Sequence, residues 1–203
     1  MMGVKDLALF SAFVRLCAAR SGTLLNQSEL ASTVGLSHST VHAWLGLLER
    51  SGLIFLLQPH HANFSKRLVK TPKIYFMDTG LLCYLLRIQS ADQIPTHPLK
   101  GALFETWVVS EMAKYFWHRG EEPPLYFWRD HKGQEIDLVV DYGSRLWPVE
   151  IKSAETIHSD FVKTIRWWEE LEGNRNQGGT VIFGGREPHI REGFSYRPWS
   201  VPF

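Results

Sequence analysis

The stretch from Glu135 to Lys152 decides how the second half of this chain folds. It reads Glu135-Ile-Asp-Leu-Val-Val-Asp141, then Tyr142-Gly-Ser-Arg145, then Leu146-Trp-Pro-Val-Glu-Ile-Lys152. The two outer segments are apolar and rich in residues that favour strands, and the short segment between them contains a glycine, which predicts a β-hairpin. A two-residue loop at Gly143-Ser144, with glycine first, suits a type II′ turn.

The register of this hairpin determines which side chains share a face. With a two-residue loop, Asp137 lies opposite Glu150, and Glu135 lies opposite Lys152. Because successive side chains of a strand alternate between faces, these four polar side chains share one face of the hairpin. The other face carries apolar side chains that can enter a core, namely Ile136, Leu138, Val149 and Ile151.

Two opposed carboxylates and a nearby lysine form a candidate site for metal-assisted phosphodiester cleavage. Asp137 and Glu150 repel each other unless water or a cation screens them. Mg²⁺ (or Mn²⁺) is commonly held by one or two carboxylates, and it lowers the pKa of a bound water. We therefore expect Asp137 and Glu150 to be metal ligands and Lys152 to be the catalytic charge. Gln134 and Glu135 are further candidates for positions near the metal.

A simpler interpretation is that this polar face is only a solvated strand surface. In that case Glu135 and Lys152 form an ordinary ion pair. Polar alternation on one strand face is common, so this alternative has to be weighed. The two strands are strongly apolar and therefore expected to be central in a sheet, which favours a site over a solvated surface.

Asp137 followed by Glu150-Ile151-Lys152 resembles the core motif of the PD-(D/E)XK nuclease superfamily, which includes the archaeal Holliday junction resolvases and many restriction enzymes. The resemblance implies a restriction-endonuclease-like mixed sheet flanked by helices. A helix before the strands often adds an acid in that fold, and Glu105, in Gly101-Ala-Leu-Phe-Glu105, matches it. The alternative role of Glu105 is that of a charge on an amphipathic helix.

The first part of the chain predicts a winged helix-turn-helix. Three segments with helical periodicity or capping signals are followed by two short runs of strand-forming residues. These segments are Leu7–Ala19, Ser28–Gly35, Ser37–Ser51, Leu53–Leu57 and Lys73–Met77. Three helices and then a two-stranded ribbon is the order of a winged helix.

The second and third helices carry the features of a helix-turn-helix. Ala31 allows close helix crossing, Gly35 takes the turn and Ser37 caps the next helix. We expect DNA contacts from the exposed start of that helix, through Ser37, His38, Ser39 and His42, and phosphate contacts from the wing, through Lys66, Arg67, Lys70 and Lys73. The alternative is a helical protein–protein module with a solvated basic loop.

The charge distribution gives modest support to this organisation. Residues up to Gly80 contain eight Lys and Arg against four Asp and Glu, whereas the remainder contains fourteen against seventeen. A basic front half attracts phosphate, and an acidic back half suits cation binding. Ala91–Pro98 contains two prolines and is the best linker candidate. We therefore expect a winged-helix domain over 1–90 and a nuclease-like domain over 98–203, in an α+β or α/β chain.

Several segments together resemble the C-terminal half of a family of predicted bacterial and archaeal AAA+ type ATPases, which ends in a domain of unknown function. They are Gly22-Thr-Leu-Leu-Asn26, Lys66-Arg-Leu-Val-Lys70, Pro72-Lys-Ile-Tyr-Phe-Met-Asp-Thr-Gly-Leu81, Gly101-Ala-Leu-Phe-Glu105 and Glu135-Ile-Asp137. In that family a P-loop ATPase precedes this region. These 203 residues contain no Gly-x-x-x-x-Gly-Lys-Ser/Thr, so we expect no ATP binding by that route and a possible ATPase module as partner.

Other patterns narrow the class of protein. Cys17 and Cys83 lie in apolar periodic stretches, which indicates free thiols in a reducing compartment. The sequence contains neither a signal-peptide core nor a run approaching the roughly 20 apolar residues that cross a bilayer, so we expect a cytoplasmic protein with no membrane partner. His60-His61 have no Cys or His partner at zinc-ligand spacing, and Asp78 is expected to cap a helix.

The prediction from sequence is thus a DNA-binding protein with a metal-dependent, nuclease-like domain that hydrolyses phosphodiester bonds of DNA. The alternative is a nuclease fold that has lost activity and serves as a regulatory or protein-interaction module together with an ATPase.

Overall fold

The computed structural model describes residues 4–61, 68–171, 174 and 176–200. Its contacts divide the chain into two compact units, neither of which is continuous in sequence. The first comprises Met1–Leu56 and Thr71–Thr106, and the second comprises Leu57–Lys70 and Trp107–Phe203. In the part of the chain that the structure describes, no helix has the length and apolar character needed to cross a membrane.

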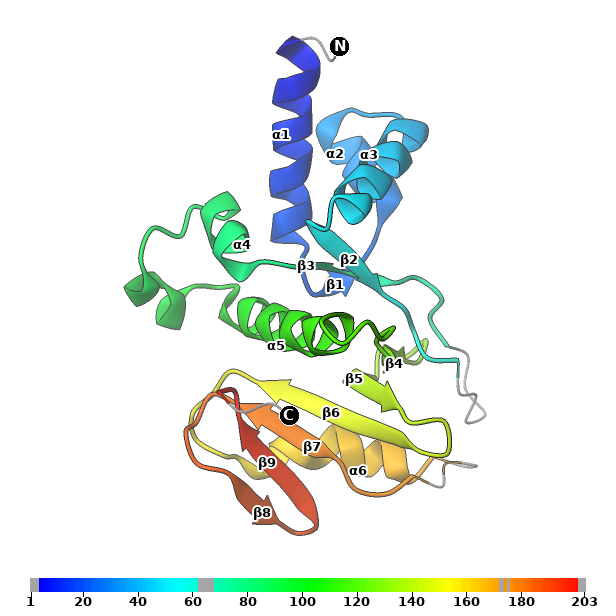
Figure 1. The fold of residues 1–203 in the computed structure, drawn as a ribbon, viewed down its shortest axis with the longest axis vertical. Coiled ribbons are helices and arrows are strands. Elements are labelled where there is room, and N and C mark those ends of the chain that lie inside the picture. Colours follow the sequence, from blue (N-terminus) through cyan, green and yellow to red (C-terminus); the bar gives the residue numbers. More distant parts are fainter. Residues whose placement is uncertain (1–3, 62–67, 172–173, 175, 201–203) are drawn as a thin grey trace. The chain divides into compact units, whose positions relative to one another are not determined.

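The first unit combines helices with a small sheet (Figure 1). Along the chain its elements are α1 (Val4–Ala19), β1 (Thr23–Leu24), α2 (Gln27–Val34), α3 (His38–Arg50), β2 (Ile54–Leu57), β3 (Lys73–Phe76), α4 (Thr79–Leu85), η1 (Ala91–Thr96) and the start of α5 (Lys100–Trp117). The sheet order is β1-β3-β2, and β1 runs antiparallel to β3. Helix α2 packs against both α1 and α3, so these three helices form one layer.

Local caps fix the turn between α2 and α3. The side chain of Asn26 accepts a hydrogen bond from Glu29 N at the start of α2, and Gly35 ends that helix with a left-handed φ of 73°. Ser37 then caps α3 by accepting from Thr40 N at 3.1 Å. Both caps satisfy amides that have no partner within the helix, which is why polar side chains stand there.

The core of the first unit lies between these helices and the sheet, and it includes Phe13, Cys17, Val41, Leu45, Leu48 and Ile74. Cys17 and Cys83 are both free, as expected. Burial raises the pKa of the Cys17 thiol to about 12, so this side chain packs as a small apolar group. Asp78 caps α4 as expected, because its side chain accepts from Leu81 N.

A buried ionic contact joins β3 to the beginning of α5. The ammonium of Lys73 lies 3.0 Å from Glu105 Oε1, and the Tyr75 hydroxyl donates to the same oxygen at 2.5 Å. Only 3% of the Lys73 side chain is exposed. Lys73 therefore faces a carboxylate inside the first unit and not solvent, which corrects its expected place among exposed phosphate contacts.

The second unit is built on a six-stranded mixed sheet with the order β4-β5-β6-β7-β9-β8. The strands are β4 (Leu125–Arg129), β5 (Glu135–Asp141), β6 (Leu146–Lys152), β7 (Thr180–Phe183), β8 (His189–Arg191) and β9 (Phe194–Pro198). Strands β4, β5 and β6 are antiparallel neighbours, β7 is parallel to both β6 and β9, and β8 is antiparallel to β9. The expectation of a mixed sheet with flanking helices is confirmed.

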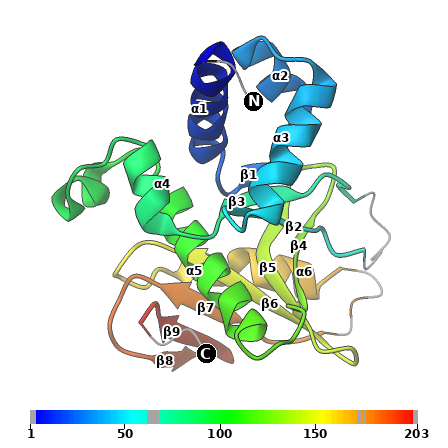
Figure 2. The ribbon, with the colours of Figure 1, turned by 45° about the horizontal axis from the view of Figure 1, so that its top comes forward.

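Helices cover both faces of this sheet (Figures 1 and 2). The C-terminal part of α5, from residue 107 onward, lies on one face, and η2 (Ser159–Val162) with α6 (Lys163–Glu169) lies on the other. The core beneath α6 includes Val139, Ile165, Trp168, Val181 and Tyr196. Val181 and Phe183 of β7 and Phe194 and Tyr196 of β9 enter this core at every second position. Ile136 and Val139 of β5 are three positions apart, because the pairing of β4 with β5 shifts register between them.

The β5–β6 hairpin has the predicted register. Leu138 pairs with Val149 and Asp141 pairs with Leu146, which leaves the expected two-residue loop at Gly143-Ser144. The turn itself is tighter than a type II′ turn requires: Ser144 N donates to Tyr142 O at 2.9 Å, and Gly143 has a φ of 77°. A hydrogen bond from residue i+2 to residue i with a positive φ between them is the geometry of a γ-turn.

The connection between β2 and β3 pairs with β4 and with the residue that follows it, Asp130. Pro59 forms a parallel bridge with Phe127, and Leu68 forms an antiparallel bridge with Asp130. Val69 N also donates to Arg129 O at 3.0 Å. The expected wing is thus strand-paired at its described ends. Lys66 and Arg67 lie outside the described residues, and Lys70 is exposed.

We expect Glu105→Ala to lower the free energy of unfolding by about 3 kcal/mol, because it removes a carboxylate from the buried ammonium of Lys73. Glu105→Gln should cost less, since its amide oxygen still accepts from Tyr75. The measurement is urea unfolding followed by circular dichroism. Glu111→Ala, in a partly solvent-accessible ion pair with Lys114 on the same helix, is the control and should change stability by less than about 1 kcal/mol. Equal losses in Glu105→Ala and Glu111→Ala would contradict this account.

Gly143→Ala should destabilise the second unit by about 1 kcal/mol, because alanine adopts a positive φ unfavourably. An added Cβ would meet no atom within 4 Å there, so the loss would come from the backbone alone. Gly101→Ala is a matched control in α5, where a Cβ also meets nothing, and it should be neutral or slightly stabilising. Thermal unfolding midpoints compare the two, and an unchanged midpoint for Gly143→Ala would count against the strained turn.

Candidate functional site

Asp137, Glu150 and Lys152 lie together on the neighbouring strands β5 and β6. The ammonium of Lys152 is 2.5 Å from Glu150 Oε2 and 3.7 Å from Asp137 Oδ2. The Lys152 ammonium therefore lies within ion-pair distance of both carboxyl groups. The three residues expected to form the site are brought together by the hairpin.

The side chain of Asp137 is held by the backbone of the neighbouring strand. Ile151 N donates to Asp137 Oδ2 at 2.9 Å, beyond the last described ladder pair, Leu138 with Val149. The carboxylate thus accepts a strand amide, which fixes its direction toward β6. The Asp137 side chain remains 18% exposed, so solvent reaches the cluster from this side.

Glu150 is the buried member of the cluster. Only 1% of this residue is exposed, and among the described residues its Oε1 atom has no hydrogen-bond partner. Burial, and next the charge of Asp137, raise the pKa of the Glu150 carboxyl to about 8, although the Lys152 ammonium opposes both effects. The protein environment thus favours the protonated form of this carboxyl more than water does.

Asp137 and Glu150 together supply two carboxyl groups, which is as many as a protein commonly provides to a magnesium ion. Mg²⁺ usually keeps several waters and binds through one or two carboxylates. Oε1 of Glu150 is an oxygen donor with no other described partner, and Asp137 is partly open to solvent. Over the described residues there is no group of three or more His, Cys, Asp or Glu side chains arranged around one point. The residues present fit an ion that is bound mainly by water and two carboxylates.

The other acids expected near the metal have different contacts. Glu135 forms an ion pair with Arg129 of β4 at 2.8 Å. Glu105 accepts from Lys73 and Tyr75 within the first unit. The main-chain N–H of Gln134 donates to Asp130 Oδ1 at 3.0 Å, as part of a turn.

Sequence reasoning missed Asp130, which is the second buried carboxyl of this unit. Only 1% of it is exposed, and Oδ1 accepts from the main-chain N–H groups of Lys132 and Gln134. Such contacts hold the turn between β4 and β5. The pattern Asp-His-Lys-Gly could have indicated this turn, because aspartate commonly begins a turn that contains a glycine three residues later.

The residues expected to contact DNA from the first unit lie at the beginning of α3. Ser37, His38, Ser39 and His42 are all exposed, whereas Val41, Leu45 and Leu48 of the same helix are buried. The Ser37 hydroxyl also lies 2.8 Å from the hydroxyls of Ser39 and Thr40. This end of the helix is polar, compact and open to solvent.

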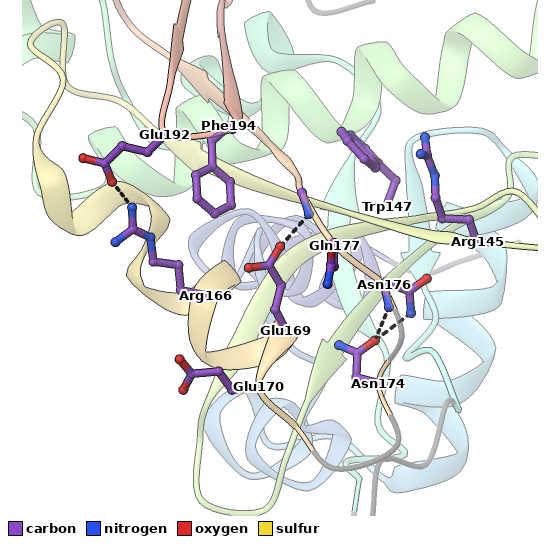
Figure 3. A pocket seen from close by; sticks show the side chains of 12 residues that line it. Arg145, Trp147, Arg166, Glu169, Glu170, Asn174, Asn176, Gln177, Glu192 and Phe194 are labelled. Carbon is purple, nitrogen blue, oxygen red and sulfur yellow. Dashed lines mark hydrogen bonds and ion pairs between the residues drawn. The ribbon is translucent and has the colours of Figure 1, made fainter.

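A hollow of about 810 Å³ lies on the second unit between α6, the start of β6 and the β8–β9 hairpin (Figure 3). Its polar groups hold one another: Arg166 pairs with Glu192, and Glu169 accepts from Gly178 N. Asn174 Oδ1 accepts from the backbone and side chain of Asn176. These contacts fix the approach to β7, which gives the hollow a structural role.

Two family models match this chain, one over each half. Residues 1–92 match the model of a domain of unknown function, DUF8612, and residues 100–200 match that of another, DUF4143. The uncharacterized proteins Mb2031c of Mycobacterium bovis and Rv2008c of Mycobacterium tuberculosis are each 34% identical over 135 residues, which is 66% of this chain. The match spans 30% of each of these relatives. No solved structure matches the chain. The chain is thus similar to two domain families in series and to part of longer mycobacterial proteins.

Proposed function

We propose that this chain binds DNA and that its second unit hydrolyses phosphodiester bonds with the help of a divalent metal ion. The observation that carries the proposal is the cluster of Asp137, Glu150 and Lys152, in which one ammonium lies within 4 Å of both carboxyl groups. Two acids and a lysine on one strand face are the groups that metal-assisted cleavage requires.

The connectivity of the second unit supports this proposal. A helix, three antiparallel strands, a helix and a strand parallel to the third strand follow one another as α5, β4–β6, α6 and β7. This order resembles the PD-(D/E)XK core. The proposed residues lie on its second and third strands, which is where the motif of that superfamily lies.

Each residue of the cluster has a distinct proposed role. Asp137 and Glu150 hold Mg²⁺ or Mn²⁺, which when bound polarises a phosphoryl oxygen and lowers the pKa of a bound water. The ammonium of Lys152 stabilises negative charge that develops on the phosphate. The main-chain N–H of Ile151 keeps Asp137 directed toward this point. Glu150 is buried, and charges interact more strongly in a protein interior than in water because the effective dielectric is lower there.

The first unit supports the DNA-binding part of the proposal. The order α1, β1, α2, α3, β2, β3 resembles that of a winged helix, and the polar beginning of α3 corresponds to the end of a recognition helix that contacts DNA. Ser37, His38, Ser39 and His42 are exposed there and can donate to phosphate or base edges. Lys70, in the β2–β3 connection, is an exposed positive charge of the second unit and is a separate candidate for a phosphate contact.

A second candidate function is that of an inactive nuclease fold that serves as a regulatory or interaction module with an ATPase. The protonated state of Glu150 favours it, because a neutral carboxyl that is already bonded to Lys152 is a poor metal ligand. The mycobacterial relatives extend well beyond the matched region, which leaves room for further domains in them.

We expect nicking of supercoiled plasmid and cleavage of branched DNA in Mg²⁺ or Mn²⁺, and its loss in EDTA. Asp137→Asn and Lys152→Ala should each reduce the rate by about 100-fold, the effect of removing one group that stabilises developing charge. Asp160→Asn and Lys163→Ala change the same residue types at exposed positions and should retain full activity. Equal cleavage by wild type and both site variants would identify a contaminant, and the absence of any cleavage would favour the inactive module.

The contribution of Glu150 to stability should fall as pH rises from about 5 to about 8. In this range the folded chain keeps a proton on Glu150, whereas the unfolded chain, with an ordinary pKa of 4.5, has released it. Glu150→Gln cannot titrate and keeps an oxygen for Lys152. Urea unfolding in EDTA should therefore show the variant gaining stability relative to wild type as pH rises. Exposed Glu155→Gln is the control, and a pH-independent difference for Glu150→Gln would contradict the raised pKa.

A further inference from the structure

A groove of about 390 Å³ on the second unit is lined by aromatic and arginine side chains. It lies between the C-terminal end of α5, the β5–β6 hairpin and strands β7 and β9. The residues that define it here are Tyr115, Phe116, Arg119, Tyr142, Trp147 and Arg197. None of them belongs to the carboxylate cluster.

Two aromatic side chains of this groove are exposed, and Phe116 and Trp147 are half-buried. Tyr142 is 58% exposed and Tyr115 is 40% exposed. The indole of Trp147 is held in place, because its N–H donates to Thr180 Oγ1 at 3.0 Å. Single exposed aromatic residues are ordinary on protein surfaces, but two exposed tyrosines and a half-buried tryptophan around one groove form a platform on which a planar ligand can stack.

Arginine side chains accompany these rings. The guanidinium of Arg119 lies 5.0 Å from the centre of the Tyr115 ring, and that of Arg145 lies 4.4 Å from the centre of the Trp147 ring. Arg145 lines the hollow of Figure 3, so the groove itself is lined by two guanidinium groups, those of Arg119 and the exposed Arg197 of β9. The carboxylate that lines the groove is that of Glu121, 3.4 Å from Arg119. Positive charge therefore exceeds negative charge around the aromatic rings.

We propose that this groove binds single-stranded nucleic acid, with unpaired bases stacked on Tyr142 and Trp147 and the phosphates near Arg119 and Arg197. Aromatic faces beside a basic groove are the features by which proteins hold single strands without reading their sequence. The charge excess complements a polyanion, and paired bases inside a duplex would leave the rings without a partner.

The groove is separate from the proposed catalytic cluster, although both use strand β6. Trp147 and Glu150 are three positions apart on this strand, so their side chains point to opposite faces of the sheet. Binding in the groove therefore does not require a metal ion or cleavage. The inference goes beyond the proposed function and can hold if that function fails.

The test is fluorescence anisotropy of labelled 20-nucleotide oligo-dT and oligo-rU with the full chain in EDTA, over a range of salt concentrations. Tyr142→Ala should weaken binding about fivefold or more, the loss expected for one stacked base. Arg197→Ala should reduce the slope of log Kd against log salt by about 0.7, as one lost phosphate contact does. The dT and rU arms show whether DNA or RNA is preferred.

Two exposed residues elsewhere serve as matched controls. Tyr84→Ala removes a tyrosine that is 74% exposed in the first unit, and Arg186→Ala removes an exposed arginine after β7. Both should bind like wild type. Undetectable binding, binding that Tyr142→Ala and Arg197→Ala leave unchanged, or equal affinity for single-stranded and duplex oligonucleotides would each overturn the proposal. Retained binding by Asp137→Asn would support a groove that is independent of catalysis.

Discussion

Glu150 places a carboxyl group inside a sheet whose neighbouring strand already carries the carboxylate of Asp137. Moving a charge out of water is costly, and a second negative charge nearby increases the cost. The chain meets this constraint in two ways: it brings the Lys152 ammonium to 2.5 Å from Glu150, and it shifts the equilibrium of Glu150 toward the protonated form. A sheet that serves only as a scaffold would need neither the lysine nor the shifted pKa, because an apolar residue in place of Glu150 would carry no desolvation cost.

The geometry of this cluster depends on the backbone that surrounds it. The short loop at Gly143-Ser144 sets the register of β5 and β6. The last described pair of this ladder is Leu138 with Val149, and beyond it the Asp137 side chain accepts a hydrogen bond from the main-chain N–H of Ile151. The strand order places β6 between β5 and β7, so its side chains are enclosed on both sides. The burial of Glu150 thus results from the position of its strand, whereas the orientation of Asp137 results from a single hydrogen bond.

Much of this arrangement could be predicted from local patterns. The helix caps at Ser37 and Asp78, the alternating strands and the hairpin register all follow from short-range chemistry, and the structure agrees with them. The fate of Lys73 could not be predicted, because its partner Glu105 is 32 residues away and only tertiary packing brings them together. Likewise, the Arg129 partner of Glu135 depends on the pairing of β4 with β5.

The segment between β2 and β3 belongs to the second unit, although the residues on both sides of it in sequence belong to the first. Pro59 and Leu68 pair with the outer side of β4, and His60 adds a contact to Asp141 at 3.1 Å. A fragment that begins at residue 100, where the second family model begins, would lose this cover and leave β4 with unsatisfied main-chain groups. Such a bare strand invites pairing with another chain and aggregation. The described parts of this connection, at Pro59 and Leu68, therefore cover main-chain groups that a C-terminal fragment without them would expose.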